Sequence, residues 1–304
     1  MKVATYNLEF LFDEGTHAHS GKEWNYTSEF VGRRVDYFTK AISDINADVI
    51  FLQELASEPV LQRILEKVGK SYAYFIATPD VNGVGNAVIF KKEINCTCAS
   101  ISAKSDHMPV FVEGDQDVIG PRIWSRRDFV FVKTMHEGRD INMLGVHIKS
   151  RFLVPQKTRE DSPVSMGNQI EWLDGNIRSE LFRFSQIRKI REVMDGLFSK
   201  DSSARVLIAG DLNCIESEVM FKMICGEKKN PADQLISSNR WLSEQDRISS
   251  SGRRVVDSIL ISKALENEVS TFRTLNEYIY TQEEPFDLLA QVGSDHAPLV
   301  LELK

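Results

Sequence analysis

The segment RVLIAGDLN (residues 205–213) joins an apolar run to a polar ending, and it indicates the fold class best. Most of residues 205–209 are apolar, which is typical of a buried strand. The acid Asp211 and the amide Asn213 follow where this strand must end. Ligands in α/β proteins bind outside strand ends, so this ending predicts a ligand site as well as a strand.

The same arrangement occurs at four further places along the chain. The polar residues that follow or precede apolar runs there are Asn7 with Glu9, Glu54, His147, and Asp295 with His296. A single such residue would be read as a solvated turn residue, because strand ends reach solvent anyway. Five occurrences with these residue types instead indicate one shared site.

The remaining segments alternate between strand and helix patterns. Strands are predicted at 3–6, 49–52, 72–77, 87–90, 129–133, 141–146, 205–209, 255–261 and 299–303, and helices at 29–45, 60–68 and 181–198. This alternation predicts an α/β fold with a mixed sheet or sheets. Strands continue on both sides of a polar stretch at 155–175, so we expect a surface excursion there rather than a domain boundary.

Composition and charge exclude several classes of protein. The 304 residues are 42% hydrophobic and carry 37 Lys and Arg against 44 Asp and Glu, a net charge of −7. These values argue against a disordered, collagen-like or coiled-coil chain. Negative charge does not favour passive adhesion to nucleic acid, so a polyanionic partner would need a local basic patch or a bound cation.

The sequence also suggests a cellular compartment. No apolar stretch approaches the roughly 18 residues that span a bilayer, and polar residues interrupt the N-terminus. We therefore expect a cytoplasmic protein without a membrane span, provided that no leader was removed. The four cysteines do not resemble a disulfide framework, and we expect Cys96 and Cys98 to share one face of a strand.

Glu54 follows the apolar run VIFL (residues 49–52) and Gln53, where an unpaired carboxylate would cost free energy. A hard cation such as Mg²⁺ would stabilise it, because Mg²⁺ takes one or two protein carboxylates and keeps its other positions for water and phosphate. The alternative is that Glu54 caps a helix at 56–68.

Asp257 presents a similar problem inside VVDSILI (residues 255–261), an otherwise apolar strand. One interpretation is a salt bridge to Arg253 or Arg254. The other is that Asp257 accepts the Nδ1 proton of a histidine, which would fix the tautomer and favour the charged imidazole near a phosphate.

Six motifs together resemble the endonuclease/exonuclease/phosphatase family. They are TYNLE (5–9), LQE (52–54), GVHIKS (145–150), GDLN (210–213), VDSILIS (256–262) and SDHAPL (294–299). The resemblance implies a single domain over residues 1–304. Its expected fold is a four-layer α/β sandwich of two mixed β-sheets packed face to face, with helices on the outside. It also implies metal-dependent hydrolysis of a phosphoester.

The resemblance assigns a role to each motif residue. Glu54 corresponds to the principal Mg²⁺ ligand, with Asn7, Glu9 and Asp295 beside the metal and Mn²⁺ as a substitute ion. Asp211 corresponds to the residue that orients or deprotonates the attacking water, and Asn213 to the amide that holds the phosphate or that water. His296, with Asp257 as its partner, and His147 correspond to the histidines that contact the phosphate.

Basic residues near these motifs indicate a polyanionic substrate, and we expect Arg127, Lys149 and Arg254 to bind it. The favoured function is a nuclease for DNA or RNA. One alternative is a phosphodiesterase or phosphatase for a lipid, as in sphingomyelinases, or for a small phosphoester, which would expose apolar loops. A second is a non-catalytic nucleic-acid-binding module, which would lack at least one of Glu54, Asp211 and His296.

Other aromatic and histidine residues leave alternatives open. Trp24, Tyr26 and Trp172 would stack on bases or belong to the core. His17 and His19 would bind a second metal or lie on the surface. The sequence indicates no protein partner.

Overall fold

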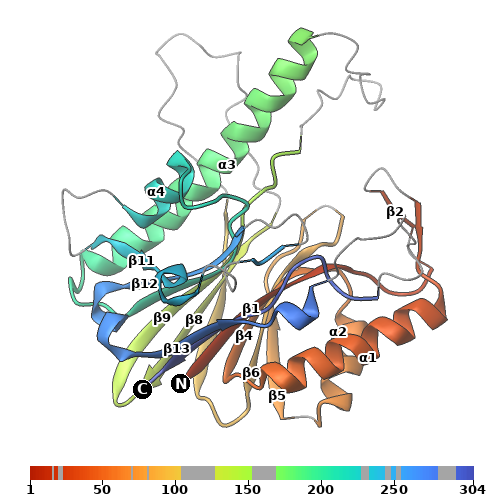
Figure 1. The fold of residues 1–304 in the computed structure, drawn as a ribbon, viewed down its shortest axis with the longest axis horizontal. Helices are drawn as coiled ribbons and strands as arrows, with labels where there is room; N and C mark the ends of the chain where they lie inside the picture. The colour runs from red at the N-terminus through yellow and green to blue at the C-terminus, as the bar shows by residue number, and fades with distance from the viewer. Residues whose placement is uncertain are drawn as a thin grey trace.

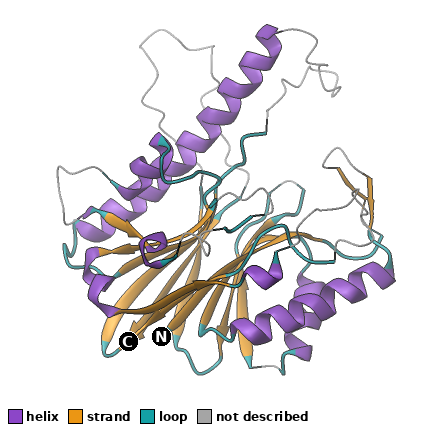
Figure 2. Cartoon of the chain, viewed as in Figure 1, coloured by secondary structure: helices purple, strands orange, loops and turns teal. Residues whose placement is uncertain are grey.

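The computed structural model describes residues 1–15, 17–19, 23–69, 71–80, 82–103, 127–152, 169–226, 233–243, 248–250, 255–279 and 292–304. Within these ranges the strands form two six-stranded mixed sheets and one two-stranded hairpin. The large sheets pack face to face, and helices cover their outer faces (Figure 1 and Figure 2). The four-layer α/β sandwich expected from the resemblance is therefore confirmed.

The first sheet has the strand order β13-β14-β1-β4-β6-β5. Its strands are β1 (Lys2–Leu11), β4 (Val49–Leu55), β5 (Tyr72–Ile76), β6 (Gly85–Lys91), β13 (Val269–Thr274) and β14 (Leu299–Leu303). β1 runs parallel to β4 and antiparallel to β14, so the last strand lies beside the first. The Met1 amino group donates a hydrogen bond of 3.0 Å to the Leu303 carbonyl, and the two termini lie close together (Figure 1).

The second sheet has the strand order β11-β12-β10-β9-β8-β7. Its strands are β7 (Cys96–Ile101), β8 (Phe129–His136), β9 (Arg139–His147), β10 (Val206–Asp211), β11 (Leu235–Ser237) and β12 (Asp257–Ser262). β9 and β10 are parallel, and β12 runs antiparallel to β10. Cys96 and Cys98 lie on one face of edge strand β7, as expected, with their sulfurs 4.0 Å apart.

The inner faces of the two sheets form a continuous apolar core. β-branched and aromatic side chains such as Val49, Val132 and Ile259 are fully buried there. The sheets approach closely where Phe51 of β4 faces Gly145 of β9, since a Cβ at residue 145 would lie 2.3 Å from the Phe51 ring. Glycine at 145 therefore lets β9 approach the Phe51 side chain of β4 closely.

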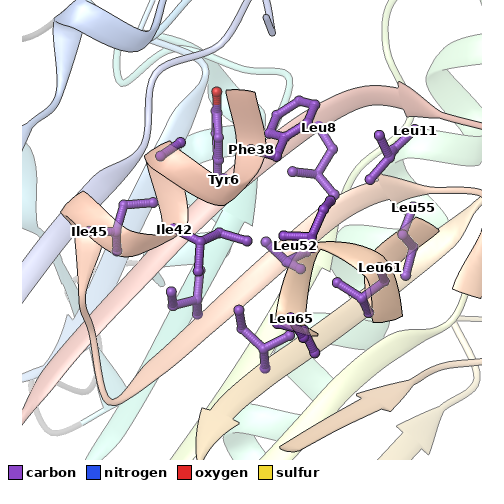
Figure 3. Packing of buried hydrophobic residues seen from close by; sticks show 14 of the residues in the cluster. Tyr6, Leu8, Leu11, Phe38, Ile42, Ile45, Leu52, Leu55, Leu61 and Leu65 are labelled. Atoms are coloured by element: carbon purple, nitrogen blue, oxygen red, sulfur yellow. The ribbon is translucent and has the colours of Figure 1, made fainter. Parts of the chain in front are cut away.

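Helices α1 (Ser28–Ile45) and α2 (Glu58–Lys67) cover the outer face of the first sheet (Figure 1). Apolar residues spaced three or four apart face the strands, and Figure 3 shows Phe38, Ile42 and Leu61 packed over β1 and β4. The Thr27 and Ser57 side chains cap these helices by accepting from the backbone N–H groups of Phe30 and Val60. Ser57, and not Glu54, is thus the cap of α2.

Helices α3 (Gln169–Phe198) and α4 (Val219–Cys225) lie on the outer face of the second sheet. Ile187, Ile190 and Met194 of α3 pack onto that sheet, while the N-terminal half of α3 projects beyond the sandwich (Figure 1). The hairpin and the 3₁₀ segments complete the described elements. They are β2 (His17–His19), β3 (Glu23–Asn25), η2 (Ser238–Trp241), η4 (Lys263–Glu268) and η5 (Asn276–Tyr278).

The largest differences from the expected element boundaries are at two places. Helix α3 begins at Gln169, so residues 169–175 of the expected excursion at 155–175 are helical, and residues 155–168 lie outside the described residues. β1 extends beyond the expected 3–6 to Leu11 through two residues of positive φ, Glu9 and Phe10. Among the described residues, no helix is both long enough and apolar enough to cross a membrane.

Candidate active site

Strand direction brings the polar motif residues to one edge of the sandwich. The parallel pairs β1/β4 and β9/β10 end there, and Asp257 at the start of β12 lies opposite Asp211 at the end of β10. The segment that precedes β14 adds Ser294, Asp295 and His296 to the same edge, where the Ser294 hydroxyl donates to the Asn7 carbonyl at 2.7 Å. Residues distant in sequence thus meet at one place, as predicted.

Asn7 connects acids from both sheets. Its Nδ2 lies 3.4 Å from Glu54 Oε1 and 3.2 Å from Asp211 Oδ2. The second Glu54 oxygen accepts from the Phe10 backbone N–H at 3.1 Å. Burial raises the pKa of Glu54 above its ordinary value, although the Arg127 charge opposes this. An amide that donates to two acids partly offsets the cost of burying them.

Glu9 and Asp295 form the second acidic pair of the site. The Asp295 backbone N–H donates to Glu9 Oε2 at 2.9 Å, and the Glu9 backbone N–H donates to Asn7 Oδ1 at 3.0 Å. Burial first, and then the nearby charge of Asp295, raise the pKa of Glu9 to about 8. A positively charged ligand beside Glu9 would favour its ionised form.

Unusual backbone conformations are concentrated at this edge. Glu9, Phe10, Glu54 and Asn213 all have positive φ between 47° and 59°. Such conformations are costly for residues other than glycine and persist where surrounding contacts hold them. The buried guanidinium of Arg34 holds one of them, because its Nη2 donates to the carbonyls of Leu8 and Glu9. The strain aims the Glu9 and Glu54 side chains into the site.

The residues present fit a hard divalent cation. Asn7, Glu9, Glu54 and Asp295 offer carboxylate and amide oxygens, the ligands that Mg²⁺ prefers. Burial and the nearby charge of Asp295 raise the pKa values of both Glu9 and Glu54, so a bound cation would favour having both ionised together. A second group of metal-ligand atoms, all within 4.8 Å of one another, belongs to Asp211, Asp257 and His296. In this group the His296 imidazole, which bonds to Asp257, already supplies the positive charge.

His296 and Asp257 form a short hydrogen-bonded pair. His296 Nδ1 lies 2.7 Å from Asp257 Oδ2, and both side chains are nearly fully buried. Burial alone would lower the pKa of His296, but the Asp257 charge and hydrogen bond, with Asp295 and Asp211 nearby, raise it well above the ordinary value. His296 is therefore cationic near neutral pH. Its other ring nitrogen, Nε2, lies 3.6 Å from Asp295 Oδ1.

Asp211 and Asn213 lie side by side at the end of β10. The Asn213 backbone N–H donates to Asp211 Oδ1 at 2.8 Å, and its Nδ2 lies 3.0 Å from Asp211 Oδ2. Burial and the adjacent Asp257 charge raise the pKa of Asp211 to about 8. The preceding Gly210 is required, because a Cβ there would lie 1.9 Å from the Val146 carbonyl oxygen.

His147 and Arg127 face the acids from the other side. His147 Nε2 lies 3.4 Å from Asp211 Oδ2 and 3.7 Å from Glu54 Oε1. Arg127 Nη1 lies 2.6 Å from His147 Nδ1 and 3.9 Å from Glu54 Oε1. Burial and the guanidinium charge lower the pKa of His147 well below its ordinary value, so this imidazole is neutral.

Of the other two predicted substrate-binding residues, Lys149 bonds to its own loop and to helix α3, and Arg254 is not described. The Lys149 ammonium donates to the Ser150 and Phe152 carbonyls and to the Ser179 hydroxyl, away from the site acids, so it fixes the loop after β9. Arg254 lies outside the described residues, as does Arg253.

The aromatic and histidine candidates also have mixed outcomes. Tyr26 is a core residue whose hydroxyl donates to the Phe10 carbonyl, so it does not stack on bases. Trp172 is half exposed on α3. The side chains of His17, His19 and Trp24 lie outside the described part of the chain.

Helix α3 supplies positioning contacts that sequence reasoning missed. Ser179, Arg183 and Gln186 lie on one buried face of the helix. Arg183 Nη2 donates to the Asn213 carbonyl at 2.8 Å, and Gln186 Oε1 accepts from the Lys149 backbone N–H at 2.8 Å. The available signal was polar residues at helical spacing in positions where an apolar face was expected.

The fold and the site together define the class. Two six-stranded sheets with acids, amides and imidazoles at one shared edge match the class of phosphoester hydrolases that the six motifs resemble. Residues 4–296 match the model of the Endonuclease/Exonuclease/phosphatase family. The chain belongs to this family, whose members are phosphoester hydrolases.

Solved structures of family members show the same fold. The catalytic domain of human Nocturnin with bound sulfate anion is 15% identical, with a TM-score of 0.61 over 100% of this chain and 94% of that chain. Truncated Caenorhabditis elegans TDP2 is 14% identical, with a TM-score of 0.61 over 99% and 95%. D. rerio TDP2 complexed with single strand DNA product is 15% identical, with a TM-score of 0.57 over 99% and 97%. No curated protein sequence matches the chain.

Proposed function

We propose that the protein is a Mg²⁺-dependent phosphodiesterase, and specifically a nuclease that hydrolyses DNA or RNA. The observation that carries this proposal is the meeting of acids and cations at one edge of the sandwich. Glu9, Glu54 and Asp295 offer oxygens suited to a metal ion, and the two cations suited to phosphate oxygens lie beside these acids, with Arg127 Nη1 3.9 Å from Glu54 and His296 Nε2 3.6 Å from Asp295. Phosphodiester hydrolysis needs both, because charge develops on the phosphate oxygens in the transition state.

The metal would be held by Asn7, Glu9, Glu54 and Asp295, with Mn²⁺ as a substitute. When bound, it supplies charge that neutralises a phosphate oxygen and the leaving oxygen. Asp211 and Asn213 hold the attacking water in line with the phosphorus atom. Burial and the Asp257 charge raise the pKa of Asp211, which makes its ionised carboxylate a stronger acceptor for the water proton.

The two histidines stabilise the reacting phosphate in different ways. His296, cationic through Asp257, donates from Nε2 to a non-bridging oxygen. His147, neutral beside Arg127, donates a hydrogen bond without adding charge. Arg127 supplies the fixed positive charge on that side.

Nucleic acid is the favoured substrate because the related D. rerio TDP2 was crystallised with a single strand DNA product. Hydrolysis of a lipid or small phosphoester is the second candidate, favoured by exposed apolar residues on the projecting half of α3. These are Ile170, Trp172, Leu173 and Ile177. A non-catalytic binding module is disfavoured, since Glu54, Asp211 and His296 are all present.

A panel assay tests the proposal. Plasmid DNA, single-stranded RNA, a sphingomyelin analogue and a generic bis-phosphodiester are each incubated with Mg²⁺ or with EDTA. We expect turnover of a nucleic acid that requires the metal. Glu54→Gln should retain the fold and lose most of this turnover, because the amide keeps the shape and removes the charge.

Glu58→Gln provides the matched control. Glu58 is an exposed residue four positions further along the chain, at the start of α2, and it accepts hydrogen bonds from Tyr74 and Gln62, so its replacement should leave turnover unchanged. Full activity in EDTA, or an unaffected Glu54→Gln protein, would refute the proposal. Cleavage of the sphingomyelin analogue alone would favour the second candidate.

A further inference from the structure

Three successive backbone carbonyls near the end of β1 are held by two buried side chains. The carbonyls of Leu8 and Glu9 accept from Arg34 Nη2 at 2.5 Å and 2.9 Å. The Phe10 carbonyl accepts from the Tyr26 hydroxyl at 2.8 Å. Arg34 belongs to α1, and Tyr26 lies two residues before that helix begins. The start of α1 is thereby fastened to the part of β1 that carries an acid of the candidate site.

Arg34 is a buried cation with few hydrogen-bond acceptors. Its side chain is 1% exposed, and its Nε and Nη1 have no hydrogen-bond partner among the described residues. The rings of Phe30 and Phe38 flank the guanidinium, with their centroids 5.8 Å and 5.3 Å from Cζ. Burying a charge in this way costs free energy that an apolar side chain of similar size would not cost. Packing alone therefore does not explain an arginine here, whereas its bonds to the two carbonyls do.

The backbone that these side chains hold is strained. Glu9 and Phe10 have φ of 47° and 52°, a conformation that persists in residues other than glycine where surrounding contacts maintain it. This turn places two acids of the site. The Glu9 carboxylate accepts from the Asp295 N–H at 2.9 Å, and the Phe10 N–H donates to Glu54 Oε2 at 3.1 Å. The positions of Glu9 and Glu54 thus both depend on the same turn.

We propose that Arg34 and Tyr26 are positioning residues that hold this turn of β1 and so set the affinity of the site for a divalent cation. Both act through the backbone carbonyls that they bind. Acids that are held in place before a cation arrives lose less conformational freedom when it binds. The inference rests on the proposed function, because Glu9 and Glu54 are among the residues proposed to hold the metal.

The sign of the effect separates positioning from charge. Like charges repel, so an arginine that acted only through its charge would weaken the binding of a cation nearby. Removal of Arg34 would then strengthen binding. If Arg34 instead holds the acids in place, its removal should weaken binding. The Tyr26 hydroxyl is neutral near pH 7, so Tyr26→Phe tests positioning without an opposing effect of charge.

Calorimetric titration with Mn²⁺ alone measures the affinity without turnover. Arg34→Met should raise the Kd for Mn²⁺ by about tenfold or more, and Tyr26→Phe by about threefold or more, as expected for loss of a charged and of a neutral hydrogen bond. Arg33→Met is the control for the first variant, because Arg33 is the preceding residue of α1 and is exposed. Tyr74→Phe is the control for the second, since the Tyr74 hydroxyl donates to the exposed Glu58 on α2. Both controls should change the Kd by less than about twofold.

A double-mutant cycle tests whether Arg34 acts through Glu9. In a Glu9→Gln background, Arg34→Met should change the Kd by less than about twofold. Circular dichroism at the titration temperature checks that each variant is folded. Tyr26→Phe keeps the ring contacts with Phe12 and Phe30, so it carries the test if Arg34→Met does not fold.

The outcomes distinguish this inference from the proposed function. An unchanged or lower Kd in Arg34→Met, an unchanged Kd in Tyr26→Phe, or equal losses with and without Glu9→Gln would overturn the inference. Each of these results would leave the proposed metal site in place. A wild-type protein that binds no Mn²⁺ would refute the proposed metal site and this inference together.

Discussion

Replacing Asp257 by Asn should move the pH dependence of catalysis in one direction. In the structure, Asp257 Oδ2 accepts from His296 Nδ1 at 2.7 Å, and the pKa of His296 is raised well above its ordinary value mainly because this contact outweighs burial. Asn keeps the shape and loses the charge. The imidazole then releases its proton at lower pH.

The magnitude follows from the type of hydrogen bond lost. Hydrogen bonds to charged groups contribute about 1.5–3 kcal/mol, and one pKa unit corresponds to about 1.4 kcal/mol. The His296 pKa should therefore fall by about one to two units. Asp211 and Asp295 remain nearby and keep part of the upward shift.

The assay is the pH profile of kcat/KM for a generic bis-phosphodiester in Mg²⁺. The alkaline limb should shift toward acid, with a larger loss at pH 8 than at pH 6, and His296→Ala should remove the limb. Asp140→Asn is the control, because this exposed acid pairs with Lys133 in the turn region of β8 and β9. An equal loss at every pH in Asp257→Asn, or a retained limb in His296→Ala, would mean that the pair does not set the profile.

Three further predictions concern the acids and the core. In EDTA the melting temperature should fall as pH rises from 6 to 9, because Glu9, Asp211 and His296 all have raised pKa values and the folded state therefore binds more protons than the unfolded state. Calorimetry with and without Mg²⁺ measures this dependence. A melting temperature that rises with pH in EDTA would contradict the prediction. The losses of kcat caused by Asp211→Asn and by Asn213→Ala should not add up in the double mutant, since the two side chains bond to each other. Strictly additive losses would indicate separate roles. Gly145→Ala should lower the free energy of unfolding in urea by about 1–3 kcal/mol, because the added methyl group meets the Phe51 ring. Adding Phe51→Leu to this variant should recover part of the lost stability. An unchanged stability of Gly145→Ala alone would exclude the close approach.

Sequence patterns predicted the strands and the shared edge well, because apolar runs and their polar endings are local features. All nine predicted strands lie within or overlap observed ones, and the predicted pair of His296 and Asp257 is in contact. Short or weakly apolar strands such as β11 (Leu235–Ser237) and β13 (Val269–Thr274) were missed, because they depend on pairing with distant strands.

Other features of the site depend on tertiary contacts that no local pattern encodes. The positive φ of Glu9 is held by backbone contacts with the side chains of Arg34 and Asn7. Asp80 stands in an ordinary turn sequence, and only the fold places it behind Arg127. Lys149 looked like a substrate contact, but carbonyls of its own loop and the hydroxyl of Ser179 take its donors.

The pairing of the last strand with the first has a consequence for when activity can arise. β14 completes the sheet beside β1, and the residues before it, Asp295 and His296, complete the site around Asn7 and Glu9. During synthesis, a chain that has emerged only as far as β12 has its acids from β1 and β4 but lacks this segment. The candidate site is therefore incomplete on a chain that has emerged only as far as β12, and it assembles only after the segment before β14 has joined β1.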